Sequence, residues 1–291
     1  MNAKILASYN LKGGVGKTTA AVNLAFAATK RGRSVLVWDL DPQGAATYFF
    51  RVKPKVKGGG KKLINGKREL ADFIKGTNYE NLDLMPADFS YRNLDLYLKK
   101  KHKTRDRLAR LIDPIQRDYD FVILDSPPGI SLLSENIFCA SDVLVIPLIP
   151  TYLSIRAYDG LQHYFRKRSE IKTQLMPFFS MVDRRRRLHQ DVVAEFTGSH
   201  PEALKTFVAY SAIVELMGRY RAPLQSFAER TEPAQAFDAL WEELKLRLGG
   251  LPSVSETPVQ ARPVQQTDPR GVVTLLSAVG AQSNRHKLTG K

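Results

Sequence analysis

The chain has 291 residues, of which 43% are apolar and 25% charged, which is enough for one large α/β domain or two small ones. Its single cysteine, Cys139, excludes an internal disulfide framework, and no apolar run approaches the roughly 20 residues of a membrane span. The net charge of +15 and the pI near 9.8 favour a polyanionic partner, with solubility alone as the alternative.

A predicted strand begins at Lys4, which leaves no room for a signal peptide, so we expect a cytoplasmic protein. Apolar runs predict further strands at 34–39, 82–86, 120–125, 142–148 and 175–182, with an edge strand at 206–209. Helical spacing predicts helices at 17–31, 99–117, 154–169, 213–220 and 233–248, and one around Val192 and Phe196. This alternation predicts an α/β fold: a doubly wound, mostly parallel sheet flanked by helices.

The composition shifts after residue 248. Residues 249–291 are rich in Pro, Ser, Gln, Val and Thr and contain few aromatic residues, which predicts a flexible, largely disordered tail. An apolar island at 272–279 has helical spacing and is a candidate for a short helix that contacts a partner or a membrane surface. We therefore expect one domain over residues 1–248 and a tail over 249–291.

A glycine-rich stretch, residues 10–19, joins the first strand to the first helix. Its glycines let backbone N–H groups curve around an anion, and the helix N-terminus adds a positive dipole end, so a phosphate-binding loop (P-loop) is predicted. Lys17 is placed to contact the phosphates, and the Thr18 hydroxyl to ligate Mg²⁺. An extra lysine, Lys12, either serves a neighbouring subunit or is a solvated side chain without a role. Nucleotide contacts are expected from Lys12, Gly13, Gly14, Val15, Gly16, Lys17, Thr18 and Thr19.

Carboxylates follow two of the predicted strands. Asp39 and Asp41 stand at the end of the second strand, and Asp125 ends an apolar run in the form of a Walker B strand. Because the carboxyl ends of parallel strands border the ligand crevice, these acids are expected beside the loop, where a buried carboxylate holds Mg²⁺ through water. Asp41 is also a candidate for a simple turn cap before Pro42.

Two stretches concentrate positive charge. Residues 51–68 contain no acid, and Gly58-Gly59-Gly60 is expected to break any regular element, so a mobile basic loop is predicted. Such a loop either contacts a phosphate backbone or is a solvated insertion. Four consecutive arginines, Arg184 to Arg187, follow a predicted strand and precede a predicted helix, which is where one exposed basic surface or a solvated turn would lie. The basic residues of the first stretch are Arg51, Lys53, Lys55, Lys57, Lys61, Lys62, Lys67 and Arg68.

Three segments together resemble the ParA/MinD family of deviant Walker A ATPases: residues 12–19, 39–44 and 125–129. The resemblance covers roughly residues 1–248 and is closer to the short ParA type. It implies an ATPase of weak intrinsic activity that uses ATP and Mg²⁺. It also implies a catalytic set of Lys12, Lys17 and Asp41, with Thr18, Asp39 and Asp125 on the magnesium side. In the family the residue that Lys12 matches crosses a dimer interface to the partner's ATP, and the one that Asp41 matches positions the attacking water.

The resemblance also implies a homodimer that forms with ATP and binds nucleoid DNA without sequence preference. An activating partner protein on a cargo (a plasmid, a chromosome origin or a protein assembly) would stimulate hydrolysis, and membrane binding is not expected. The implied DNA contacts lie in the C-terminal half, at Arg184, Arg185, Arg186, Arg187, Arg219 and Arg221.

Two positions depart from the family pattern. Tyr210 and Ser211 stand where a basic residue is common, and Ser180 stands where Asn or Thr is common near the adenine. Three other functions stay open. They are a MinD-like membrane-cycling ATPase, a metabolic or redox enzyme on the same fold, and a DNA-binding scaffold that only holds nucleotide.

Overall fold

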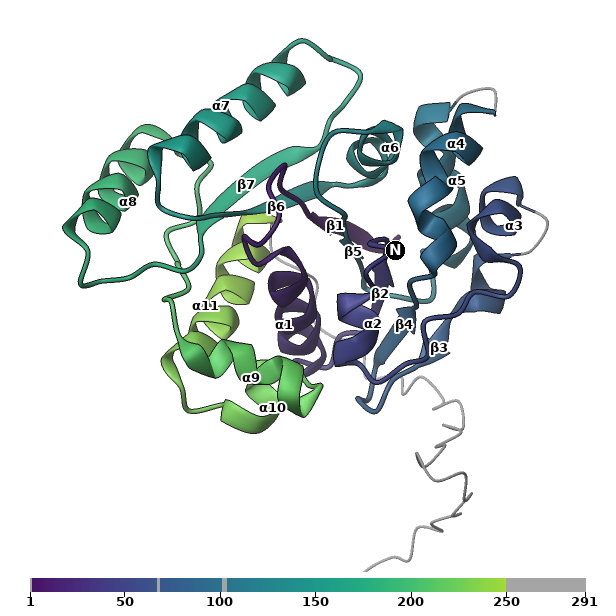
Figure 1. Cartoon of the computed structure of the whole chain (residues 1–291), viewed down its shortest axis with the longest axis horizontal. Helices are drawn as coiled ribbons and strands as arrows, with labels where there is room; N and C mark the ends of the chain where they lie inside the picture. Colours follow the sequence, from purple (N-terminus) through teal and green to yellow (C-terminus); the bar gives the residue numbers. More distant parts are fainter. Residues whose placement is uncertain (1, 67–68, 101–103, 250–291) are drawn as a thin grey trace, which may run out of the picture. The chain divides into compact units, whose positions relative to one another are not determined.

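The computed structural model describes residues 2–66, 69–100 and 104–249 of the chain. Within these residues, seven strands form one sheet in the order β3-β4-β2-β5-β1-β6-β7, with helices on both faces (Figure 1). Every neighbouring pair is parallel except β3 with β4. The predicted fold class is therefore confirmed. The strands are β1 (Lys4–Ser8), β2 (Val35–Asp39), β3 (Lys75–Gly76), β4 (Leu82–Met85), β5 (Phe121–Asp125), β6 (Val143–Leu148) and β7 (Gln174–Phe179).

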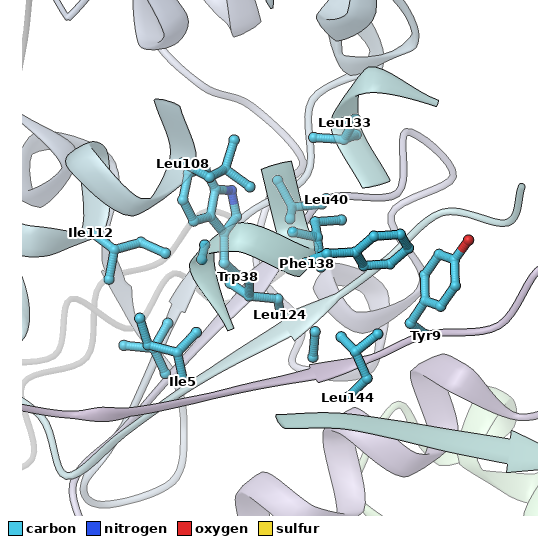
Figure 2. Packing of buried hydrophobic residues seen from close by; sticks show 14 of the residues in the cluster. Ile5, Tyr9, Trp38, Leu40, Leu108, Ile112, Leu124, Leu133, Phe138 and Leu144 are labelled. Carbon is cyan, nitrogen blue, oxygen red and sulfur yellow. The ribbon is translucent and has the colours of Figure 1, made fainter. Parts of the chain in front are cut away.

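Successive side chains of the central strands pack on opposite faces of the sheet. In β5, Val122 and Leu124 join one buried cluster, whereas Phe121 and Ile123 join the other. Figure 2 shows part of the first cluster, in which Trp38 and Leu124 lie near residues from the covering helices. Because both faces are covered, the strands are apolar along their whole length, as expected for a parallel sheet.

The helices divide between these two clusters. Those that pack into the second cluster are α1 (Lys17–Thr29), α2 (Ala45–Phe49), α9 (Ala212–Tyr220), α10 (Leu224–Ala228) and α11 (Glu232–Arg247). Those that pack into the first are α3 (Gly59–Asn65), α4 (Leu94–Lys99), α5 (Arg107–Ile112), α6 (Leu132–Ala140), α7 (Tyr152–Arg166) and α8 (Arg187–Ser199). Short 3₁₀ turns lie at Leu70–Phe73, Phe89–Asn93, Thr104–Asp106 and Asp113–Ile115.

Two expectations about regular elements were wrong. The predicted edge strand at 206–209 is only an isolated bridge between Val182 and Ala209. The long helix predicted over 99–117 is shorter: α4 ends at Lys99, and α5 covers only Arg107–Ile112 before a 3₁₀ turn that contains Pro114. Proline removes an N–H donor and clashes with the preceding turn, which explains the early end of α5.

The basic stretch at 51–66 was also predicted wrongly, because its three glycines begin a helix instead of breaking one. Gly58 and Gly59 have φ values of 94° and 65°, and α3 starts at Gly59. A Cβ on Gly60 would lie 2.8 Å from Leu94 Cδ2 and 3.2 Å from Tyr91 Cδ1. The glycines therefore allow this segment to pack closely against the residues after β4.

Some predictions fall outside the described residues. These are the basic residues Lys67 and Arg68 and, apart from Gly249, the tail predicted over 249–291 with its helical island at 272–279. The boundary at residue 248 stays a prediction.

Candidate nucleotide site and basic surfaces

The glycine loop connects the end of β1 to the start of α1, as predicted. Gly14 and Gly16 have φ values of 72° and 94°, which side-chain-bearing residues rarely adopt. A Cβ built on Gly13 or Gly14 would meet no atom within 4 Å, so the loop is open on that side. The N-terminus of α1, at Lys17, lies at the end of this open loop. This arrangement is suited to an anion such as a phosphate.

Hydrogen bonds to β6 and to the residue after β7 hold the loop in place. The amide of Asn10 donates to the carbonyl of Pro147 at 2.7 Å, and the Asn10 Oδ1 accepts from the backbone N–H of Lys12 at 2.9 Å. The Ser180 hydroxyl donates to the Val15 carbonyl at 2.8 Å. Ser180 thus supports the loop from the residue after β7, a contact that the sequence reasoning missed. A loop fixed in this way loses little conformational entropy when it binds a ligand.

The two lysines of the loop have different surroundings. Lys17 is 7% exposed, and its Nζ donates to the Lys12 carbonyl at 2.9 Å. Burial lowers the pKa of Lys17, although the charges of Asp125 and Asp41 act in the opposite direction. The Lys12 side chain is exposed and makes no ion pair with any described residue. One lysine therefore lies inside the site, and the other lies on its outer side.

Asp39 and Asp125 end neighbouring strands and are partners in register across β2 and β5. Both residues have no exposed surface. The Asp39 carboxylate accepts from the backbone N–H and the hydroxyl of Thr47 at 2.8 and 2.7 Å. Neither carboxylate oxygen of Asp125 accepts a hydrogen bond of good geometry from a described residue, although the Thr18 hydroxyl is near enough to act against the rise in its pKa. Buried polar atoms are nearly always paired, so the unpaired Asp125 carboxylate indicates a site for a cation or its bound water.

Burial also shifts the titration of this pair. Burial raises the pKa of Asp39 to about 6, although the hydrogen bonds from Thr47 act to lower it. Burial and the charge of Asp39 together raise the pKa of Asp125 well above its ordinary range. Two carboxylates this close cannot both ionise easily unless a positive charge joins them.

The residues present fit a magnesium ion. No described group of three or more His, Cys, Asp and Glu side chains could bind a metal by itself. Mg²⁺ typically keeps several waters and takes one or two carboxylates together with phosphate oxygens, so a hydroxyl and two carboxylates beside a phosphate loop suit it.

Asp41 lies two residues beyond the strand end, in a turn. Its Oδ1 accepts from the Gln43 backbone N–H at 2.9 Å, and its carbonyl accepts from the Gly44 N–H at 2.9 Å. The interpretation of Asp41 as a turn cap therefore accounts for one of its two carboxylate oxygens. The other oxygen makes no hydrogen bond or ion pair with a described residue, which leaves it available to a ligand.

Thr47 is a second residue that sequence reasoning missed. Its hydroxyl donates to Asp39 and accepts from the Ala87 backbone N–H at 2.8 Å, and its carbonyl accepts from the Val52 N–H at 3.1 Å. It thereby joins the buried carboxylate to the residues after β4 and to the start of the basic stretch. The only sequence signal was a small hydroxyl residue in the first turn after the Asp39–Gly44 segment.

Comparison with known proteins agrees with this geometry. Residues 3–181 match the protein family described as an AAA domain. The sporulation initiation inhibitor protein Soj of Bacillus subtilis is 34% identical over 197 residues, which are 66% of this chain and 78% of that protein. The chromosome-partitioning ATPase Soj of Treponema pallidum is 27% identical over 251 residues, which are 84% of this chain and 98% of that protein. This chain belongs to the ParA/MinD family of partition ATPases.

The fold also resembles the solved structure of a protein that is not named as a partition protein. Cobyrinic acid a,c-diamide synthase of Mycobacterium smegmatis, solved with bound ADP and magnesium, has a TM-score of 0.71. It is 24% identical in sequence, and the match covers 88% of this chain and all of that chain. At this level the likeness concerns the fold alone. No helix in the described part of this ParA-family ATPase is long and apolar enough to cross a bilayer.

The ParA-family ATPase carries its four consecutive arginines, Arg184–Arg187 (called the arginine turn below), after β7 and at the start of α8, whose first residue is Arg187. All four are exposed. Arg184 pairs with Glu232 at 2.7 Å, Arg185 with Asp183 at 3.0 Å, and Arg187 with Asp191 at 3.8 Å. Neighbouring acids therefore offset much of the positive charge of this predicted DNA surface.

The other two predicted DNA contacts lie at the end of α9. Arg219 is exposed. Arg221 has a left-handed backbone with φ of 49°, donates to the Tyr48 carbonyl at 3.1 Å, and lies over the Tyr48 ring at 4.5 Å. The structure thus gives Arg221 a role in joining α9 to α2, and it places the six predicted residues in two groups, at the start of α8 and at the end of α9.

Proposed function

We propose that this ParA-family ATPase forms an ATP-bound sandwich dimer, binds DNA without sequence preference and moves or positions a cargo through partner-stimulated hydrolysis. One observation supports this proposal most strongly. The unpaired, buried Asp125 lies in register with Asp39 beside the buried Lys17, whereas Lys12 is exposed on the outer side of the same loop. These features support a phosphate site and, beside it, a lysine that forms no ion pair with any described residue.

We propose that the site binds ATP with Mg²⁺. The loop N–H groups and Lys17 would contact the phosphates, and Thr18, Asp39 and Asp125 would hold the metal, the carboxylates through water. Mg²⁺ would neutralise charge that develops on the phosphate oxygens. The ADP and magnesium bound to the Mycobacterium smegmatis synthase, on the same fold, support this assignment.

Asp41 would orient the attacking water. Phosphoryl transfer depends mostly on positioning and charge stabilisation, so a carboxylate with one oxygen fixed by a turn can hold a water in line with the other. Weak hydrolysis that disappears in Asp41→Ala, with nucleotide binding retained, would support this role. Unchanged hydrolysis would exclude Asp41 as the residue that orients water.

Lys12 would act on the nucleotide of a second subunit and so couple ATP binding to dimerisation. Lys12→Ala should retain nucleotide binding by the monomer and lose the ATP-dependent dimer, as measured by light scattering with ATP and with ADP. Lys30→Ala, which removes a lysine at the far end of α1, serves as the control. A Lys12→Ala protein that dimerises normally with ATP would disprove the trans role.

The proposed DNA contacts are the arginine turn and Arg219, together with Arg221. The central test is co-sedimentation with DNA in ATP, in ADP and without nucleotide, at two salt concentrations. Binding through phosphate contacts releases counterions and should weaken steeply with salt. DNA retention that ignores both nucleotide and salt would overturn the proposed mechanism.

A further inference from the structure

The basic stretch after α2 carries five lysines whose environment differs from that of the arginine turn. We call Lys53, Lys55, Lys57, Lys61 and Lys62 the lysine segment. All five are exposed, and none forms an ion pair with a carboxylate in the described part of the chain. In the arginine turn, by contrast, three of the four residues have an acid within 4 Å.

The backbone that carries these lysines is fixed. The Val56 N–H donates to Asp88 at 2.9 Å, and the Gly60 N–H donates to the Ser90 hydroxyl at 2.7 Å. Lys75 reaches across from β3 and donates to the carbonyls of Lys53 and Lys55, both at 3.2 Å. A ligand that binds here does not have to order the chain first.

The segment also has a local excess of positive charge. The pKa of Lys75 is lowered, first by burial and then by the charges of Lys53 and Lys55. Among the described residues, Asp88 contacts the segment; its oxygens accept hydrogen bonds from Val56 and Ser90, and the charge of Lys55 also helps to lower its pKa. Lysines on a fixed backbone that form no ion pair with a described carboxylate attract a polyanion.

From these contacts we infer that the lysine segment is a second binding surface for the phosphate backbone of DNA. This inference rests on the proposed function, because it assumes that the protein binds DNA at all. Val56, Leu63 and Ile64 are buried in the core, and the exposed apolar residue among the lysines is Pro54, so the segment offers no aromatic or long aliphatic anchor to a lipid surface. Phosphate contact without insertion therefore fits a nucleic acid better than a membrane.

The two basic surfaces lie at opposite ends of the sheet. The lysine segment packs beside α4 and the residues after β4, whereas the arginine turn follows β7, and Figure 1 shows α3 and α8 far apart on the two sides. Five strand spacings separate β4 from β7, which is roughly 24 Å at about 4.8 Å each. This exceeds the Debye length of about 8 Å at physiological salt, so the two surfaces make independent contributions.

The test uses full-length protein with ATP and a DNA duplex of mixed sequence, with affinity measured by fluorescence anisotropy over a range of salt. Lys53→Gln/Lys55→Gln/Lys57→Gln should weaken binding at least tenfold. It should also make the slope of log affinity against log salt shallower by about 2 to 3, since each phosphate contact contributes about 0.9. Lys55→Gln/Lys61→Gln should have about two thirds of that effect on the slope.

The matched control removes the same charge elsewhere. Arg117, Lys167 and Lys172 are exposed, and Arg117 and Lys172 precede β5 and β7, at the amino-terminal edge of the sheet. Arg117→Gln/Lys167→Gln/Lys172→Gln should change the slope by less than half as much as the lysine-segment variant. An equal effect of the two triple variants would mean that only net charge matters, and would overturn the inference.

Two further outcomes separate this inference from the proposed function. If the lysine variants bind DNA as the wild type does while Arg184→Glu/Arg185→Glu does not, the inference fails and the proposed function stands. If the wild type does not bind DNA with ATP, both fail. If the lysine variants lose binding to anionic phospholipid vesicles but keep their DNA binding, the inference is overturned in favour of a membrane surface.

Discussion

The arginine turn and the lysine segment have similar charge but different surroundings. In the arginine turn, Arg184 and Arg185 are held by Glu232 and Asp183. In the lysine segment, the backbone is held by hydrogen bonds to Asp88 and Ser90, while the lysine side chains have no acid partner among the described residues. A count of basic residues therefore does not measure how much charge a surface offers to a polyanion.

The largest expected effect comes from reversing charge in the arginine turn. Arg184→Glu/Arg185→Glu should lower DNA affinity with ATP by more than about 100-fold, because two phosphate contacts become repulsive and Asp183 and Glu232 lose their partners. ATP-dependent dimerisation should stay intact, as measured by light scattering. Loss of the dimer as well would assign these arginines to folding or assembly instead of DNA.

The second prediction concerns the fixed backbone of the lysine segment. Gly60→Ala places a methyl group against Leu94 and Tyr91, both buried, and should destabilise the protein by about 1–2 kcal/mol in urea unfolding. Gly198→Ala, near the end of α8 that is farther from the arginine turn, meets no atom within 4 Å and is the control. It should be neutral or stabilising by up to about 1 kcal/mol, since alanine favours helix. Equal effects would show that the lysine segment is not held by close packing.

The third prediction is a pH dependence. Hydrogen bonds from Ser90 and Val56 outweigh burial and lower the pKa of Asp88. A lowered pKa in the folded state stabilises the protein above the unfolded pKa, near 4, and this stabilisation is lost as pH falls through the folded value. Asp88→Asn should therefore cost about 1 kcal/mol at pH 7, and the difference from wild type should shrink on acidification. A difference that is constant down to pH 3 would contradict this account.

The smallest effect is expected from removing the acid that pairs with Arg185. Arg185 lowers the pKa of Asp183 to about 2 through hydrogen bonds, so this pair stays charged at any physiological pH. Asp183→Asn should strengthen DNA affinity a few-fold and steepen the salt dependence, because Arg185 no longer has a competing acid. Asp72→Asn, which removes an exposed carboxylate that forms no ion pair with a described residue, provides a control for net charge. Unchanged affinity in Asp183→Asn would mean that Arg185 does not contact DNA.

The sequence alone predicted most of the candidate nucleotide site, because its parts are local. A glycine loop between an apolar strand and a helix, and acids directly after two other apolar runs, place Lys17, Asp39 and Asp125 at one edge of any parallel sheet. The continuous apolar runs likewise indicated strands covered on both faces. These inferences needed only neighbouring residues and the geometry of parallel strands.

Only the tertiary structure decided which partners the charged residues have. The Ser180 contact with Val15 joins residues 165 positions apart, and Arg184 meets Glu232 from a distant helix. Three consecutive glycines, which locally favour a break, lie at the start of α3, and at Gly60 the side chains of Leu94 and Tyr91 leave little room for a Cβ. The partners of a charge, and the space around a glycine, come from segments far away in the chain, so no local pattern could reveal them.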